Sequence, residues 1–368
     1  MNVYIAMLIL WGVVAFIFAC SPLYFKHDSS QNRVINDKLQ RKIILFCSIS
    51  LTIIIGFRGV EVGSDTEGYM KDYLFWGGRR VSNLKISLSD EIGYKFLQRV
   101  STILGVKWQL FLIIIAIVIV ACYLILVKKY SCYAFAPYFL YVTIGLFVLN
   151  MTGIRQSLAV ACCMIAYIFA EKRKLFYFLV IIAIAVSIHS TALCFLPVYF
   201  IFSIKEINKK ELAIFLFLPL ITRLMSTPLK RVLYLFAFDR YLGNGYFSSV
   251  NLNLNIWAEL FPLAIMILGF ILLVIKSEIS SRDCYLFVMT SIYASTYQLT
   301  HAVYMAGRLC FYFSPFMVLL LGNAIFSIKD MRVRVISYVG VLLISLLFFV
   351  ITIPGSSYRI DNYMFFWN

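Results

Sequence analysis

The chain has 368 residues, of which 62% are hydrophobic and only 14% are charged, and its mean hydropathy is +0.90. These values exclude an ordinary soluble globular protein and indicate a polytopic membrane protein. The formal net charge of +16 does not indicate a nucleic-acid partner, because the basic residues are scattered between apolar segments rather than gathered on one stripe.

Apolar segments long enough to cross a bilayer as helices follow one another along the chain, and short polar breaks separate them. The predicted spans lie near 3–25, 43–57, 108–127, 134–150, 154–170, 212–227, 257–275, 284–300, 308–327 and 335–353. The first lacks the basic region and cleavage site of a secretory signal, so we interpret it as a retained span. The sequence therefore predicts an all-α fold, a single transmembrane domain over 1–368 with about 10–12 spanning helices.

Segment 175–204 is too long for one ordinary span and short for two, and the distribution of basic residues decides its topology. If the cluster within 26–42 is cytoplasmic, alternation places the "EKRK" turn at 171–174 on the same side. The basic clusters after residue 204 join that side only if 175–204 goes out and returns. We therefore predict two short helices or a re-entrant hairpin near 175–204, with His189 at its external tip. Two long external loops then cover 58–107 and 228–256.

The stretch "GFRGVEVGSDTEGY" at 56–69 sets charged residues among glycines, where the backbone can turn tightly and approach a ligand. Arg58 would face an anion at the membrane interface, and Asp65 would be available as a base or a metal ligand. Alternatively, these charges only solvate a loop outside the membrane.

Arg155 begins an apolar run in "GIRQSLAVA", next to Gln156 and a face of small residues that favours close helix packing. The alternative is an arginine whose side chain extends to the outer surface. An external arginine at a tight turn runs against the charge bias of membrane proteins, so we favour a functional role for Arg155.

Two further stretches carry polar residues on the outer side, "SIHST" around residue 189 and "GRLCFYF" from residue 307. Imidazole side chains titrate near neutral pH, so His189 could act as a base or an acid; alternatively, it is a solvated loop histidine. Arg308 begins a predicted span. Tyr304 and Tyr312 could stack on sugar rings, but an interfacial aromatic belt explains these tyrosines equally well, and we prefer the belt.

Arg58, Arg155 and Arg308 are thus predicted on one side of the membrane, each at a helix end. Guanidinium groups hold phosphate oxygens bidentately and stay charged in a low-dielectric site, so the set suits an anionic lipid head, and a pyrophosphate best justifies several arginines. The nine cysteines lie almost all in or beside apolar segments without a C-x-x-C pair, which favours packing residues over disulfides or metal ligands. We find no Walker A or G-x-G-x-x-G motif and predict no metal and no cofactor.

An ordered set of motifs runs through nearly the whole chain: "FRG…VGSDTEGY", "DEIGYKFL" at 90–97, "GIRQSLAVA", "EKRK", "IHSTAL" and "GRLCFYF". In this order the set resembles the EpsG-like branch of Wzy-type O-antigen and exopolysaccharide polymerases. The resemblance implies a glycosyltransferase of the bacterial inner membrane with its active site facing the periplasm, where the two long loops would lie. It would polymerise undecaprenyl-pyrophosphate-linked oligosaccharide repeat units and release undecaprenyl pyrophosphate.

The resemblance also implies roles for the candidate residues. Arg155 and Arg308 would clamp the pyrophosphate, with Arg58 assisting. His189 would be the general base, with Asp65 or Glu91 as rivals. The residues expected to contact substrate are Tyr69, Gln156, Tyr304 and Tyr312. The implied partners are the lipid-linked donor and acceptor and the membrane lipids, and they could include a chain-length regulator and a flippase.

Two alternatives differ in class. A polyprenyl-phosphate-sugar glycosyltransferase would use acidic residues of the first external loop with a divalent cation, and "DTE" at 65–67 has the spacing for this. A lipid-linked oligosaccharide flippase would be built from repeated halves with charges from many helices. No repeat is visible and the charges cluster toward one side, so the flippase is the less favoured alternative.

Overall fold

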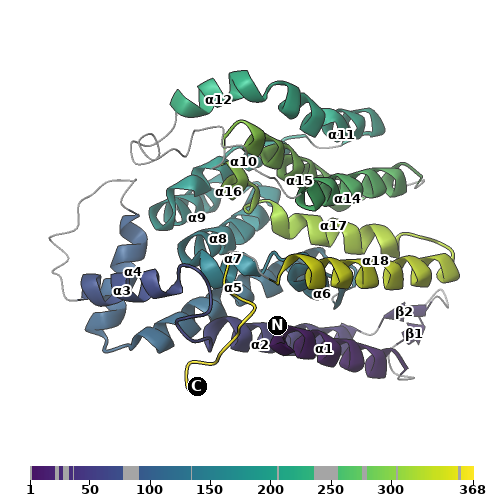
Figure 1. Cartoon of the computed structure of the whole chain (residues 1–368). Helices are drawn as coiled ribbons and strands as arrows, with labels where there is room; N and C mark the ends of the chain where they lie inside the picture. The colour runs from purple at the N-terminus through teal and green to yellow at the C-terminus, as the bar shows by residue number, and fades with distance from the viewer. Residues whose placement is uncertain are drawn as a thin grey trace. The chain divides into compact units, whose positions relative to one another are not determined.

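The structure is a computed structural model, and it describes residues 2–20, 25–27, 33–35, 37–77, 91–133, 135–204, 207–235, 256–275, 280–303, 306–354 and 358–368. Apart from one antiparallel ribbon, in which β1 (Phe25–His27) pairs with β2 (Arg33–Ile35), the regular elements of these ranges are helices (Figure 1). This confirms the prediction of an all-α polytopic membrane protein.

The chain divides into two compact units. Unit 1 comprises Met1–Leu84, Tyr94–Ala161 and Ile336–Asn368, and unit 2 comprises Lys85–Gly93 and Cys162–Val335. Three of the four unit boundaries fall within α4 (Ile92–Ile103), α8 (Ile154–Glu171) and α18 (Met331–Thr352). The prediction of a single domain over 1–368 stays a prediction.

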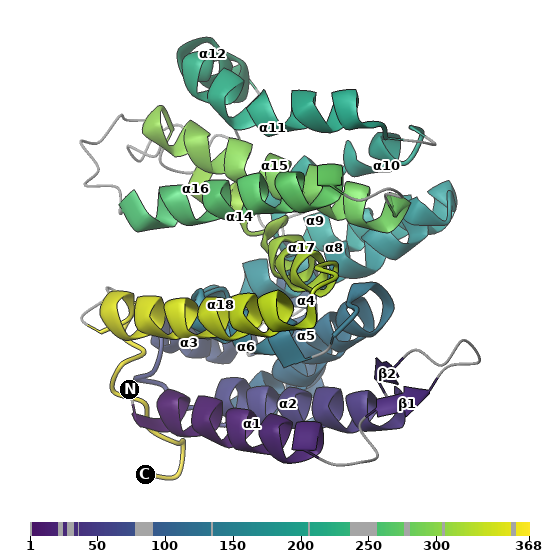
Figure 2. The same ribbon diagram turned by 90° about the vertical axis from the view of Figure 1, so that its right-hand side faces the viewer.

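Unit 1 is built around long apolar helices near its N-terminus. Its remaining helices are α1 (Asn2–Cys20), α2 (Asp37–Gly56), α3 (Thr66–Gly77), α5 (Trp108–Tyr130), α6 (Phe135–Thr143) and α7 (Val148–Thr152). Helices α1 and α2 lie side by side, with the β-ribbon near one end of the pair (Figure 2). Helix α2 can pack closely on α5 because Gly56 has no side chain. A Cβ atom at Gly56 would lie only 3.1 Å from the Cα of Ile113.

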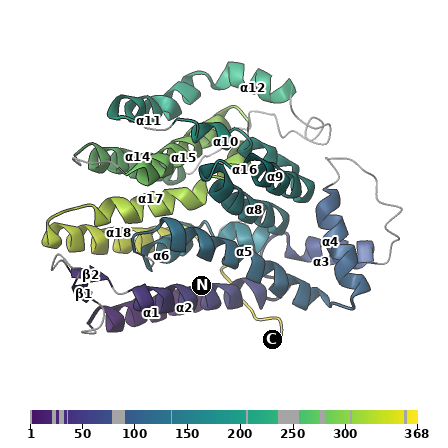
Figure 3. The same ribbon diagram turned by 180° about the vertical axis from the view of Figure 1, so that it is seen from behind.

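Unit 2 contains the remaining helices, several of which are short. They are α9 (Leu175–Ile188), the 3₁₀ helix η3 (Ser190–Phe195), α10 (Val198–Ile201), α11 (Lys209–Leu224), α12 (Ser226–Leu235), α14 (Ile256–Ile275), α15 (Ser281–Gln298), the 3₁₀ helix η4 (Leu299–His301), α16 (Ala306–Cys310) and α17 (Ser314–Phe326). Helix α15 packs against α11, α14 and α17 and forms the centre of this unit (Figure 3).

Within the described ranges, four helices are long and apolar enough to cross a membrane, and a fifth results if α11 and α12, bent by 79°, form one span. The four are Lys38–Gly56, Trp108–Tyr130, Ile154–Glu171 and Met331–Thr352. The predicted 10–12 spans therefore include shorter apolar helices. The predicted span 134–150 divides into α6 and α7 because Gly145 adopts a left-handed φ of +82°. The predicted span 308–327 likewise divides between α16 and α17.

Segment 175–204 forms the predicted hairpin of short helices. Helix α9 ends at Ile188, His189 is extended (φ −150°, ψ 113°), and η3 packs back on α9. Two hydrogen bonds join the end of the hairpin to the turn before α9. Arg173 Nη1 donates to the Tyr199 carbonyl at 2.8 Å, and the Tyr199 hydroxyl donates to the Arg173 carbonyl at 3.2 Å. The chain thus comes back to the level where α9 began, with His189 at the turn. Its side of the membrane stays a prediction.

The predicted loops differ in character. Part of segment 58–107 is helical, because α3 and α4 lie within it. Most of the predicted loop 228–256 lies outside the described residues, apart from the end of α12.

Candidate functional site

In unit 1, the loop between α2 and α3 is fixed against the end of α7. The Thr66 hydroxyl donates to the carbonyls of Val62, at 2.7 Å, and of Met151, at 3.2 Å. Gly63 has a φ of +94°, and a Cβ atom there would collide with the Met151 carbonyl oxygen. The loop of "GFRGVEVGSDTEGY" therefore lies directly beside the residues that lead into Arg155.

We expect Gly63→Ala to destabilise the protein by about 1–3 kcal/mol, because it adds both a strained backbone and a clash with main chain. The measurement is the thermal unfolding midpoint of the purified protein in detergent. Gly68→Ala is the matched control: no heavy atom lies within 4 Å of its Cβ position, and alanine favours the helical conformation that α3 requires. Equal midpoints for the two variants would contradict the tight contact.

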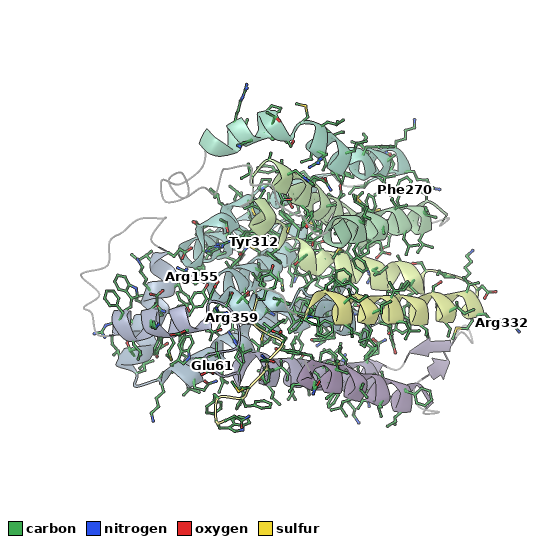
Figure 4. All side chains as sticks on the ribbon, viewed as in Figure 1. Glu61, Arg155, Phe270, Tyr312, Arg332 and Arg359 are labelled. Atoms are coloured by element: carbon green, nitrogen blue, oxygen red, sulfur yellow. The ribbon has the colours of Figure 1, made fainter. Side chains whose placement is uncertain are left out.

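Arg155 and Tyr69 come together across this contact. The guanidinium carbon of half-buried Arg155 lies 5.2 Å from the centre of the Tyr69 ring, a cation–π arrangement. Tyr69 in turn packs edge-on against Tyr94 of α4, at 6.1 Å between ring centres. Gln156 is buried in the first turn of α8. Figure 4 labels Arg155, and also Glu61 and Arg359 of the same unit.

Arg58 is completely buried, contrary to the expectation of an interfacial loop residue. Its Nη1 donates to the carbonyl of Ile55, whereas Nε and Nη2 have no hydrogen-bond partner among the described residues. Burial lowers the pKa of Arg58 from its usual value to about 10, and the nearby Tyr363, Tyr4, Tyr94 and Tyr69 oppose this effect. Arg58 therefore remains charged at neutral pH in a desolvated position.

Residues 358–368, which we call the strap, cover Arg58 and were missed by the sequence analysis. Four main-chain hydrogen bonds of 2.8–3.0 Å join the strap to the loop after α2: Gly59 to Met364, Phe366 to Phe57, Gly63 to Arg359 and Ser64 to Tyr358. The Tyr363 hydroxyl also donates to the Ile54 carbonyl, at 3.0 Å. The aromatic content of the segment "NYMFFWN" was its only signal in the sequence.

In unit 2, Glu91 and His189 form a buried hydrogen-bonded pair. His189 Nδ1 donates to the Glu91 carboxylate, and their side chains are 6% and 1% exposed. Glu91 adopts a φ of +50°, and a Cβ atom at Gly93 would collide with Ser187, so the turn before α4 fits closely against the end of α9. The other imidazole nitrogen, Nε2, has no partner within the described ranges. Glu91 thus holds the His189 side chain in place. The sequence analysis had considered Glu91 only as a rival of His189 for the role of general base.

Tyr312 lies in the same unit and is fully buried. Its hydroxyl shares a hydrogen bond of 2.9 Å with Thr191, two residues after His189. Phe195 of the hairpin stacks on Phe313, with ring centres 5.6 Å apart. A belt residue faces lipid at the interface, so the belt interpretation is wrong for Tyr312. This packing attaches the hairpin to the segment that contains Arg308.

The remaining candidates are more peripheral. Arg308 is exposed on α16, and Asp65 is exposed before α3, where its carboxylate accepts a 3.0 Å hydrogen bond from Ser64. Tyr304 lies outside the described residues. The side chains of eight of the nine cysteines are described, and none of these eight forms a disulfide bond. In the part of the chain that the structure describes, no group of three or more His, Cys, Asp or Glu side chains could hold a metal ion.

The candidate residues thus gather in two clusters, an arginine–tyrosine cluster in unit 1 and the Glu91–His189 pair with Tyr312 in unit 2. A carboxylate on Nδ1 fixes the imidazole orientation and stabilises its protonated form, so Nε2 can accept a proton. Buried or half-buried guanidinium groups stabilise anions more strongly than solvated ones do.

Together, the helices and clusters define a polytopic helical membrane protein with polar groups suited to proton transfer and anion binding. The chain belongs to the EpsG family, whose model matches residues 41–367, nearly the whole chain. This confirms the resemblance seen in the motifs and supports, in general terms, a membrane polysaccharide polymerase. No significant match was found among curated proteins or among solved structures.

Proposed function

We propose that the protein polymerises undecaprenyl-pyrophosphate-linked oligosaccharide repeat units into O-antigen or exopolysaccharide at the periplasmic face of the bacterial inner membrane. The observation that carries this proposal beyond family membership is the buried Glu91–His189 pair, in which His189 Nε2 has no partner among the described residues. Such a pair is suited to remove a proton from a sugar hydroxyl.

In the proposed reaction, a hydroxyl of the acceptor sugar attacks the anomeric carbon of the donor glycan. His189 Nε2 takes the hydroxyl proton as the new glycosidic bond forms. The bond between the anomeric carbon and the pyrophosphate oxygen breaks, and the oxygen leaves with the electron pair. The Glu91 carboxylate stabilises the imidazolium that results.

Arginines would stabilise the charge that develops on the departing pyrophosphate. Half-buried Arg155, held over Tyr69, is the main candidate, with Arg58 and Arg308 contributing. A fixed guanidinium costs no reorganisation during the reaction and supplies the charge stabilisation that a divalent metal supplies in other enzymes.

The test is a polymerisation assay with the purified protein in nanodiscs, its host's lipid-linked repeat unit and EDTA. The proposal predicts a ladder of lipid-linked glycans that grows by whole repeats. No ladder, with the same substrate elongated by crude membranes of the host, would reject a metal-independent polymerase. Restoration of activity by Mg²⁺ or Mn²⁺ would instead favour the metal-dependent transferase.

We expect Arg155→Lys to reduce the polymerisation rate at least tenfold, because lysine keeps the charge but loses the planar fork and the stacking on Tyr69. The rate is measured as repeats added per unit time at saturating acceptor. Arg332→Lys, at an exposed position, is the matched control and should retain the wild-type rate. Full activity of Arg155→Lys would rule out a bidentate clamp at this position.

A further inference from the structure

Several buried hydrogen-bonding groups of Arg58 and of tyrosines near it have no partner among the described residues. We call Arg58, Tyr4, Tyr69, Tyr94 and Tyr363 the Arg58 enclosure. Tyr4 and Tyr94 are 0% and 2% exposed, and their hydroxyls, like Nε and Nη2 of Arg58, have no hydrogen-bond partner among the described residues. Four buried polar atoms of Arg58, Tyr4 and Tyr94 are therefore left without partners among the described residues.

The positive charge in the enclosure is also uncompensated. Within the described part of the chain, Arg58 makes no ion pair, and its one hydrogen bond satisfies only Nη1. A buried charge without a partner costs several kcal/mol, so proteins rarely keep one without a compensating ligand. The hydrogen bond to the Ile55 carbonyl at the end of α2 accounts for the burial of Nη1. It does not account for the burial of Nε and Nη2.

The free groups have the chemistry of an oxyanion site. Nε and Nη2 form one edge of the guanidinium, the fork that binds two oxygens of a phosphate bidentately. Phenolic hydroxyls can donate to further oxygens of the same anion. All of these groups belong to unit 1, and the strap contributes Tyr363 to the enclosure.

We propose that the Arg58 enclosure binds one phosphate-type anion, which Arg58 and the hydroxyls of Tyr4 and Tyr94 hold together. The biological source of this anion rests on the proposed function, in which a lipid-linked pyrophosphate is the donor head group and the leaving group. Free inorganic phosphate or pyrophosphate has the same chemistry. The site adds Tyr4 and Tyr94 to the residues that bind the anion.

The test measures the thermal unfolding midpoint of the full chain in phosphatidylcholine nanodiscs against inorganic pyrophosphate, with ionic strength held constant by chloride. Wild-type protein should show a saturable rise in the midpoint. Tyr4→Phe and Tyr94→Phe should each raise the apparent Kd roughly tenfold, since each removes one hydrogen bond to a charged acceptor. Arg58→Gln should abolish the saturable rise.

Tyr123→Phe is the matched control, because Tyr123 is equally buried but donates to the Pro137 carbonyl at 2.8 Å. It should retain the wild-type Kd. The Tyr94→Phe variant keeps the ring and loses a hydroxyl that has no hydrogen-bond partner in the described part of the chain, so its folding should be unaffected. A wild-type midpoint that does not respond to pyrophosphate, or the same Kd in Arg58→Gln, would overturn the proposal.

Two further arms separate the sources of the anion and the two proposals. Nanodiscs that contain polyprenyl pyrophosphate should weaken the response to inorganic pyrophosphate if the lipid head occupies the site; an unchanged response assigns the site to the free anion. His189→Asn should bind the anion normally although it cannot polymerise. Polymerisation by wild-type protein without any anion response would overturn the site alone, and binding without polymerisation would overturn the proposed function alone.

Discussion

Replacing His189 by Asn is expected to lower the polymerisation rate by about 10²–10⁴-fold, the range that a positioned general base contributes. The loss should appear in kcat, because the imidazole acts on the acceptor hydroxyl during the chemical step rather than in donor binding. The measurement is the initial rate of chain elongation at saturating donor and acceptor. His301→Asn, at another histidine of unit 2, is the control and should stay close to wild type.

Glu91→Gln should lower kcat less than His189→Asn does, because it keeps the shape of the partner and removes its charge. In the double variant, the two losses should not add, because Glu91 acts only through His189. Additive losses would mean that Glu91 acts independently of the imidazole. A His189→Asn enzyme that retains more than about a tenth of the wild-type rate would exclude the general-base role altogether.

Arg58→Gln is expected to stabilise the ligand-free protein and to abolish polymerisation at the same time. The lowering of the pKa of Arg58 from its usual value to about 10 corresponds to about 3 kcal/mol against the charged form in the fold. Loss of the hydrogen bond to Ile55 offsets part of this, which leaves a net gain of about 1–2 kcal/mol. The thermal unfolding midpoint in detergent should therefore rise while the rate of elongation falls below detection.

The pH dependence checks the cause of this gain. Because the folded-state pKa of Arg58 lies below its unfolded-state pKa, the unfolded chain binds more protons above about pH 10, and the stability of the wild-type protein recovers only there. Below that window, Arg58 is charged in both states and the penalty is constant. The difference between variant and wild type should thus be the same at about pH 6 and about pH 8. A less stable Arg58→Gln variant would show that the charge is compensated.

The hairpin around His189 was predictable because it follows from charge. Positive residues at 171–174 and after 204 had to lie on one side, so the intervening chain had to return, and the contacts between Arg173 and Tyr199 show this return. Local features of this kind, such as apolar length and basic turns, are properties of short segments. The all-α class and the position of the turn were accordingly predicted correctly.

The relationship between Glu91 and His189 was not predictable in this way. The two residues are separated by 98 positions, and their contact depends on the fit of Gly93 against Ser187. From the sequence, the carboxylate was therefore only one more candidate base. A glycine directly after an acidic residue was the one available signal, and it is too common to be specific.

The burial of Arg58 was missed for a similar reason. A loop of charges and glycines after a span predicts solvent exposure, and nothing local indicates that residues 358–368 cover it. Hydropathy also does not detect the breaks at Gly145 and between α16 and α17, so the division of the predicted spans 134–150 and 308–327 into shorter helices was missed. Both features arise where tertiary contacts or single backbone angles override segment composition.

The strap has a consequence for biogenesis. The Tyr363 hydroxyl reaches a carbonyl that lies 309 positions earlier in the chain, and the hydrogen bonds of Gly59 and Gly63 span similar separations. Contacts of such range form only after the intervening chain has been synthesised, and they are slow to form. During synthesis, α2 and the loop after it that contains Arg58 are therefore made long before the strap. Until residues 358–368 have been synthesised, the loop that contains Arg58 lacks these hydrogen bonds.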